Sequence, residues 1–198
     1  MLDRRVPEVR VPDEIRMANE ADAEAIAAIY APTVENTAIS FETTAPDRDE
    51  FARRLCHTLE TLPWLVFEAE GGVAGYAYAS AFRAREAYRW SCEVSLYVAS
   101  DAHRGGVGRR LYLALLDLLT RQGYRRAFAG ITLPNPASVG LHEALGFETV
   151  GVYRGAGFKF DAWHDVGWWQ RALHLSDAPP EPTLDLADAV AALDLSAY

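Results

Sequence analysis

The residue types that point most directly to chemistry lie within residues 93–110 (EVSLYVASDAHRGGVGRR), where glycines are flanked by arginines. The residues concerned are Arg104, Gly105, Gly106, Gly108, Arg109 and Arg110. They follow a segment at 92–98 that alternates with the period of a β-strand, and they precede apolar residues at helical spacing from Val107 onward. The first turn of a helix offers free N–H groups and the positive end of the dipole, and glycine lets backbone approach a phosphate closely. The pattern predicts an anion site; the alternative is a turn that only connects a strand to a helix.

Two familiar phosphate-binding motifs are excluded by the residues around these glycines. A Walker loop ends in Gly-Lys-Ser/Thr, whereas Gly108 is followed by Arg109 and Arg110. The dinucleotide pattern G-x-G-x-x-G would begin at Gly106 and fails at Leu111. A nucleotide-hydrolysing loop and a dinucleotide fold are therefore not indicated.

The elements that must position this loop follow from the apolar periodicity of the whole chain. Strands are predicted at 15–18, 64–70, 73–81, 92–98, 126–133, 147–158 and 162–175. Helices are predicted from residue 19 or 20, at 47–60, from 107, and from about 136 to Gly146. Pro32 is expected to bend or stop the first helix, and residues 33–46 to form a loop or an irregular strand. Beyond Ser176, one short helix can form around Leu186, Val190 and Leu193.

The segment His103-Arg104-Gly105-Gly106-Val107-Gly108 resembles the coenzyme A pyrophosphate loop of the GNAT acetyltransferases, Arg/Gln-x-x-Gly-x-Gly/Ala. It departs from that pattern at its first position, which holds His103. Further motifs resemble the phosphinothricin/methionine sulfone acetyltransferase branch: Trp64-Leu-Val66, FRAREAYRW at 82–90, Glu93-Val-Ser-Leu-Tyr-Val98, Leu133-Pro-Asn135, LHEALGF at 141–147, Ala156-Gly-Phe-Lys159 and Trp163-His-Asp-Val-Gly167.

The resemblance implies an α/β chain with the GNAT fold, a mixed, mostly antiparallel central sheet flanked by helices on both faces. We expect a flexible N-terminal arm at 1–14, the GNAT domain at 15–175 and an acidic, proline-containing C-terminal tail at 176–198. The implied activity is transfer of acetyl from acetyl-CoA to the amine of phosphinothricin or a methionine sulfone or sulfoximine, directly within a ternary complex.

The resemblance also implies roles for individual catalytic residues. An amine must lose a proton before it attacks, and the family assigns that base role to the glutamate matching Glu93, on the polar face of the strand at 92–98. The alternative for Glu93 is a structural carboxylate paired with Arg85 or Arg89. His142 is the candidate proton donor to the departing thiolate, and Tyr97 competes for that role.

The cofactor contacts implied by the resemblance fall on three segments. The glycine loop would hold the pyrophosphate, and the backbone of the strand would pair with the pantetheine arm. Asn135 can bind that arm or cap its own helix. The full set of expected contacts is Leu96, Tyr97, Val98, Arg104, Gly105, Gly106, Val107, Gly108, Arg109, Asn135 and Ser138.

The acceptor is expected to bind at the basic loop that connects two strands before Glu93. Guanidinium groups recognise carboxylates and phosphinates through paired hydrogen bonds. The residues assigned to this role are Phe82, Arg83, Arg85, Tyr88 and, less directly, Lys159. The alternative for this loop is an ordinary solvated connection.

Composition limits the other possibilities. The net charge of −9 argues against nucleic acid and anionic membrane surfaces as partners. We also expect no membrane segment and no metal, because the histidines lack ligand spacing. The two cysteines, Cys56 and Cys92, do not make a disulfide framework, which fits a protein of the reducing cytoplasm. Cys92 is expected to be buried in the core and not to act as a nucleophile.

Two other functions remain open at this stage: a GNAT enzyme for a peptide N-terminus or polyamine, and a coenzyme-A-binding regulatory module without turnover. A homodimer is expected from the family and from aromatic residues late in the chain, at Phe158, Phe160, Trp163, Trp168 and Trp169.

Overall fold

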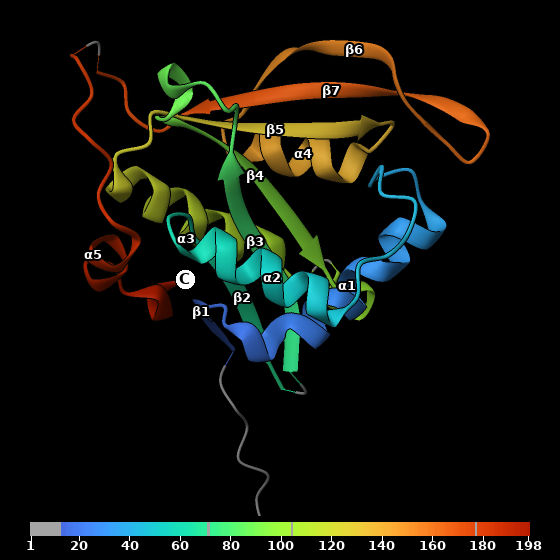
Figure 1. Cartoon of the computed structure of the whole chain (residues 1–198), viewed down its shortest axis with the longest axis horizontal. Helices are drawn as coiled ribbons and strands as arrows, with labels where there is room; N and C mark the ends of the chain where they lie inside the picture. The colour runs from blue at the N-terminus through green and yellow to red at the C-terminus, as the bar shows by residue number, and fades with distance from the viewer. Residues whose placement is uncertain (1–12, 71, 104, 177) are drawn as a thin grey trace, which may run out of the picture.

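The protein is built on one mixed sheet, which the computed structural model describes together with its helices over residues 13–70, 72–103, 105–176 and 178–198. In this part of the chain the sheet has seven strands in the order β1-β2-β3-β4-β5-β7-β6 (Figure 1). The strands are β1 (Glu14–Met17), β2 (Trp64–Ala69), β3 (Gly72–Ala81), β4 (Ser91–Val98), β5 (Arg126–Leu133), β6 (Glu148–Lys159) and β7 (Ala162–Ala172). Neighbours are antiparallel except β4 and β5, which are parallel. The predicted mixed, mostly antiparallel sheet is confirmed.

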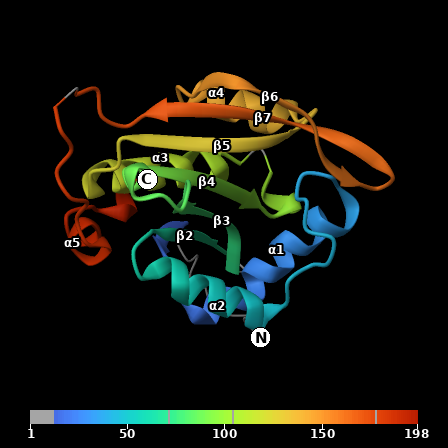
Figure 2. The same cartoon turned by 45° about the horizontal axis from the view of Figure 1, so that its top comes forward.

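Helices cover both faces of the sheet because its strands alternate apolar side chains to the two sides. On one face, Trp64, Val66 and Tyr76 pack with α1 (Ala23–Asn36) and α2 (Arg48–Leu59). On the other face, Leu65, Phe67 and Ala77 belong to the larger core formed with α3 (Val107–Gln122) and α4 (Pro136–Ala144). Figures 1 and 2 show α1 and α2 on one side of the sheet, and in Figure 1 α4 is drawn beneath β5.

Pro32, which is expected to bend or stop the first helix, does not stop it. The helix α1 runs on to Asn36, so residues 33–36 are helical and only residues 37–46 form the connecting loop. A proline inside a helix costs about 3 kcal/mol. Val34 beyond it is 1% exposed, and burying such a side chain contributes about 1.5–3 kcal/mol. The side chains of Asn36 and Thr37 also donate to the carbonyls of Pro32 and Thr33, at 3.1 and 2.6 Å.

The other helix ends follow the capping signals in the sequence. The side chain of Asp47 accepts from the N–H of Glu50 at the start of α2, and Asn135 caps α4 with Pro136 in its first turn. Gly146 has a φ of 79°, so it ends the α4 segment in the left-handed region that glycine favours.

The segment after β7 packs against the domain. A short helix, α5 (Leu186–Ala191), lies beside α3 in Figures 1 and 2. Leu186 and Ala189 are buried in the same core as α3, and the Leu184 N–H donates to the Gln122 carbonyl at 2.8 Å. The short helix predicted around Leu186, Val190 and Leu193 is thus present, and it covers α3.

Candidate active site

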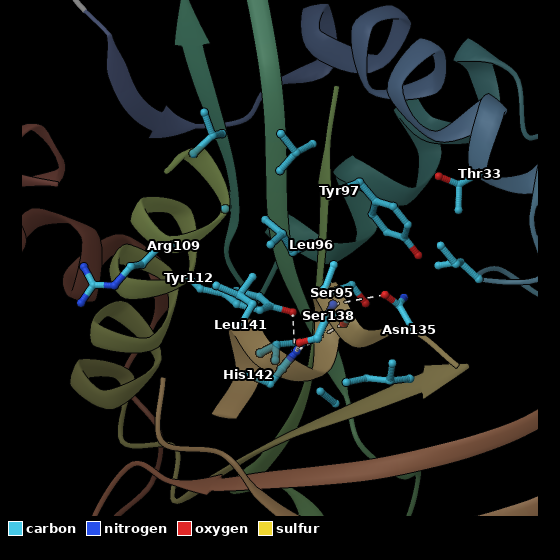
Figure 3. A pocket seen from close by; sticks show the side chains of 18 of the residues that line it. Thr33, Ser95, Leu96, Tyr97, Arg109, Tyr112, Asn135, Ser138, Leu141 and His142 are labelled. Carbon is cyan, nitrogen blue, oxygen red and sulfur yellow. Dashed lines mark hydrogen bonds between the residues drawn. The ribbon is translucent and has the colours of Figure 1, made fainter. Parts of the chain in front are cut away.

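A pocket of about 730 Å³ opens where β4 and β5 separate. Their parallel pairing runs from Ser91 and Arg126 to Glu93 and Phe128, and then the strands diverge. The walls come from β4, from residues 129–132 of β5, and from the facing ends of α1, α3 and α4 (Figure 3). Side chains from both faces of the sheet line it, so the pocket connects the α3 side of the sheet with the α1 side.

The predicted glycine loop forms one end of this pocket. Gly106 precedes α3 with a φ of 81°, and no described side chain caps the first turn, so its N–H groups are free for an anion. A Cβ on Gly108 would lie 2.9 Å from Leu96 Cδ2, so only glycine lets the helix approach β4 this closely. Arg109 also lines this end, whereas Arg104 lies outside the described residues.

His103, which departs from the usual loop pattern, lines the same end of the pocket. Its Nε2 donates to the Val98 carbonyl at 3.0 Å, which ties the loop to the end of β4. The same pocket is lined by six further residues expected to contact the cofactor, Leu96, Tyr97, Val98, Val107, Asn135 and Ser138, whereas Gly105 is exposed beside Gly106.

The side chain of His142 is buried and hydrogen-bonded at both nitrogens. Its Nδ1 donates to the Ser138 carbonyl at 2.7 Å, because a carbonyl can only accept. In the neutral ring Nε2 therefore accepts from the Tyr112 hydroxyl, 3.1 Å away (Figure 3). Burial lowers the pKa of His142 below its usual 6.5, so the neutral form prevails at pH 7.

Tyr112 is a pocket residue with a polar group that the sequence analysis did not predict. It is 1% exposed, and burial together with nearby Tyr78 and Glu93 raises its pKa well above the usual 10, so it stays protonated. It follows Leu111 in an apolar helix, and the sequence pattern therefore gives it no signal beyond a core position. Only its hydrogen bond to His142, thirty residues later, marks it as part of the site.

Glu93 lies on the α1 side of β4, half-buried and next to the point where the strands separate. Burial raises the pKa of its carboxyl above the usual 4.5, and the Arg83 guanidinium partly opposes that rise. It is not among the pocket-lining residues, but its neighbours on the strand, Val94 and Ser95, are. A buried carboxylate with a raised pKa is a stronger base than a solvated one.

Aromatic rings and one guanidinium surround the Glu93 side of the sheet. Phe82 stacks on Phe128 with ring centroids 4.0 Å apart, and Trp168 meets Phe82 edge-on at 6.2 Å. The guanidinium carbon of Arg83 lies 4.2 Å from the Phe82 ring centroid and 5.5 Å from that of Trp168. The Trp168 Nε1 is buried without a hydrogen-bond partner among the described residues. These groups can receive an anionic or polar ligand beside Glu93.

The remaining predicted acceptor residues lie apart from one another. Tyr88 meets the Phe82 ring edge-on at 5.8 Å, whereas Arg85 is exposed where the loop turns. Arg89 pairs with Glu86 at 3.0 Å, so it does not act as the partner of Glu93. Lys159 is buried, with its Nζ donating to the carbonyls of Val34 and Ser40.

Comparison with known proteins places this geometry in a family. Residues 15–168 match the model of the acetyltransferase (GNAT) domain. The chain belongs to the GNAT acetyltransferases. It is 44% identical over 173 residues to phosphinothricin N-acetyltransferase of Streptomyces viridochromogenes, covering 87% of this chain and 94% of that protein. It is 37% identical over 167 residues to L-methionine sulfoximine/L-methionine sulfone acetyltransferase of Salmonella typhimurium, covering 83% and 97%.

A solved structure agrees with this assignment. The phosphinothricin acetyltransferase of Sinorhizobium meliloti, crystallised with AcCoA, is 38% identical and superposes with a TM-score of 0.81, over 87% of this chain and 94% of that one. The chain is therefore an acetyl-CoA-dependent N-acetyltransferase, as the GNAT resemblance implied.

Among the described residues, no helix has the length and apolar character to cross a membrane. Nor do three or more His, Cys, Asp or Glu side chains gather there in a way that could hold a metal ion.

Proposed function

We propose that this GNAT enzyme acetylates the α-amine of a small amino acid whose side chain carries a tetrahedral polar or anionic group, such as phosphinothricin, methionine sulfone or methionine sulfoximine. The observation that carries the proposal is the position of Arg83, stacked on Phe82 and Trp168 beside the half-buried Glu93. A cation held on aromatic rings next to a base can hold the anionic end of an acceptor while the amine faces the base. The names of the relatives in Streptomyces and Salmonella support the same acceptor class.

The described residues fit acetyl-CoA as the acetyl donor. The free N–H groups after Gly106, the close approach at Gly108 and the Arg109 guanidinium would hold its pyrophosphate. The separated edges of β4 and β5 would hold the pantetheine arm, with Asn135 and Ser138 at the start of α4 beside it. When bound, acetyl-CoA supplies the thioester carbon that the amine attacks.

Glu93 takes a proton from the ammonium form of the acceptor, directly or through one water. At pH 7 a model amine with a pKa of about 10 is almost wholly protonated, so a base is needed for attack. Attack by the freed amine on the thioester is direct, within a ternary complex. Cys92 takes no part, because it is buried and its pKa is raised to about 12.

In the neutral ring the Tyr112 hydroxyl proton lies in the hydrogen bond to His142 Nε2, so Tyr112 can donate to the departing thiolate only after the His142 ring has taken up a second proton from solvent. Nε2 then donates to the Tyr112 oxygen, the hydroxyl proton passes to the thiolate, and the ring proton replaces it on the phenol. The structure thus favours a shared role for His142 with Tyr112 over direct protonation by His142. Tyr97 also lines the pocket, and burial with neighbouring tyrosines raises its pKa well above the usual value, so it too stays protonated; of the two tyrosines, Tyr112 is the one hydrogen-bonded to His142.

The enzyme acts as a homodimer in the cytoplasm. The β6–β7 hairpin exposes Tyr153, Phe158, Phe160 and Trp163, each by more than half, and a second copy can cover them. Trp169, which the sequence counted toward this surface, is 5% exposed and belongs to the core. Both cysteines are free, as a reducing compartment requires.

An acceptor panel tests the proposal. Purified protein and acetyl-CoA are incubated with phosphinothricin, methionine sulfone, methionine, a short peptide and a polyamine, and free thiol is measured over time. We expect the first two to give the highest kcat/KM. A preference for the peptide or the polyamine would replace the proposed acceptor class, and no thiol release with any amine would favour a non-catalytic coenzyme A module.

A further inference from the structure

We propose that Lys159 is a positioning residue that fixes the loop at residues 37–46 over the acceptor end of the pocket. The proposal rests on the proposed function, because it concerns how that acceptor site is closed. The sequence assigned Lys159 to contact with the acceptor; the proposal gives it a different task, acting through the loop.

Lys159 ties two distant parts of the chain together. Its Nζ donates to the Val34 carbonyl at 2.6 Å, at the last turn of α1, and to the Ser40 carbonyl at 2.8 Å, inside the loop. Lys159 itself is the last residue of β6, paired with Ala162 of β7. A single ammonium therefore joins the last turn of α1 and the first half of the loop to β6, the edge strand of the sheet.

The sequence contains eighteen arginines and one lysine. That lysine is Lys159, whose side chain is buried. An ammonium is a compact cation with three donors on a flexible stem, whereas a guanidinium is a wide planar fork. Two carbonyls converging on one point suit the ammonium. The one lysine of the chain thus lies where a compact ammonium group fits, and the chain's other long cationic side chains are arginines.

Other contacts close the loop onto the same strands. The Thr132 hydroxyl on β5 donates to the Ile39 carbonyl at 3.2 Å. Phe41 lies against Gly157 on β6 so closely that a Cβ there would come within 2.2 Å of the Phe41 ring. Apolar burial holds the loop only in part, since Ile39 is 46% exposed and Phe41 39% exposed. Polar contacts hold it as well: Lys159 and Thr132 bind its backbone carbonyls, and the Ser40 and Glu42 side chains bind Tyr30 and Arg54.

The anchored segment lines the pocket on the side away from the pyrophosphate loop (Figure 3). Thr33 and Ile39 line the pocket on either side of the Val34 carbonyl that Lys159 binds. Figure 3 shows Thr33 beyond Tyr97, on the side opposite Arg109. Loss of the anchor should thus disturb the acceptor and leave acetyl-CoA binding intact.

The test compares Lys159→Met with a matched control, Arg154→Met, which removes an exposed cation from the same strand. We expect Lys159→Met to raise the acceptor KM about tenfold or more, with a smaller change in kcat and an unchanged acetyl-CoA Kd by calorimetry. Amide hydrogen exchange should rise within residues 37–46 and stay unchanged in α3. Arg154→Met should match the wild type in all of these measurements.

A second variant keeps the test decisive if Lys159→Met folds poorly. Thr132→Val removes only the Ile39 anchor and should raise the acceptor KM in the same direction by a smaller factor. Unchanged acceptor KM and unchanged exchange in the loop, or equal weakening of acceptor and acetyl-CoA binding, would overturn the proposal. If the wild type does not acetylate acidic amino acids, the proposed function fails, while the exchange comparison still decides whether Lys159 holds the loop.

Discussion

Replacing Glu93 with glutamine removes the proposed base while keeping the size of the side chain. Loss of a positioned general base costs about 10²–10⁴-fold in rate. Glu93 is half-buried with a raised pKa, so its basicity lies above that of a solvated carboxylate, and we expect kcat/KM to fall at least about 10²-fold at pH 7. Between pH 7 and 9 the free fraction of an amine with a pKa of about 10 rises nearly 100-fold, so most of the loss should be recovered at pH 9.

Glu93→Gln should also change the free energy of unfolding, in a direction that follows from the raised pKa of Glu93. A carboxyl whose pKa is raised by folding holds its proton more tightly in the folded state. Its contribution to stability therefore falls as the pH rises from 4.5 through the folded pKa. At pH 7 the ionised Glu93 is unfavourable, and Glu93→Gln should raise Tm while activity is lost.

The assay is a steady-state pH profile of thiol release, with thermal melts of both proteins at pH 7. Wild-type kcat/KM should fall on the acid side as Glu93 is protonated, at a pH above 4.5, and Glu93→Gln should lack that limb. An activity loss smaller than about threefold at pH 7, or a Tm that falls together with activity, would refute the assignment of Glu93 as the base and favour a structural carboxylate.

Three further predictions concern other parts of the account. Gly108→Val should raise the acetyl-CoA Kd sharply in calorimetry, because a Cβ there already meets Leu96 at 2.9 Å; unchanged affinity would contradict the pyrophosphate placement. Tyr112→Phe should lower kcat about tenfold or more with little change in acceptor KM, and an unchanged kcat would exclude its hydroxyl from the reaction. Light scattering at micromolar concentration should give twice the single-chain mass of 21.9 kDa, and the mass of one chain would reject the homodimer.

Much of the fold was predictable because the relevant signals are local. The strand at 126–133 matches its predicted bounds, since alternation and flanking polar residues are both present in the segment itself. The ends of the α4 segment at Asn135 and Gly146 could be predicted for the same reason. At Pro32 local reasoning failed, because burial of Val34 on the far side of the proline is a tertiary effect.

The site was only partly predictable. The glycine loop is contiguous, so its residues and their chemistry can be read together. The hydrogen bond between Tyr112 and His142 joins two helices thirty residues apart, and Tyr112 sits in a row of apolar residues that predicts only a core position. The resemblance assigned Lys159 to the acceptor, and its contact with the carbonyls of Val34 and Ser40 depends on a fold that brings these distant residues to its Nζ.

The most direct test of the proposed acceptor is the effect of Arg83→Ala on the choice between phosphinothricin and methionine, with Arg85→Ala as the matched control. Charge-assisted hydrogen bonds are worth about 1.5–3 kcal/mol, and 1.4 kcal/mol is a factor of ten. The account predicts that Arg83→Ala lowers kcat/KM for phosphinothricin about tenfold or more relative to methionine, with acetyl-CoA affinity unchanged. An unchanged ratio of the two kcat/KM values in Arg83→Ala would contradict the proposal that this guanidinium selects an acidic amino acid.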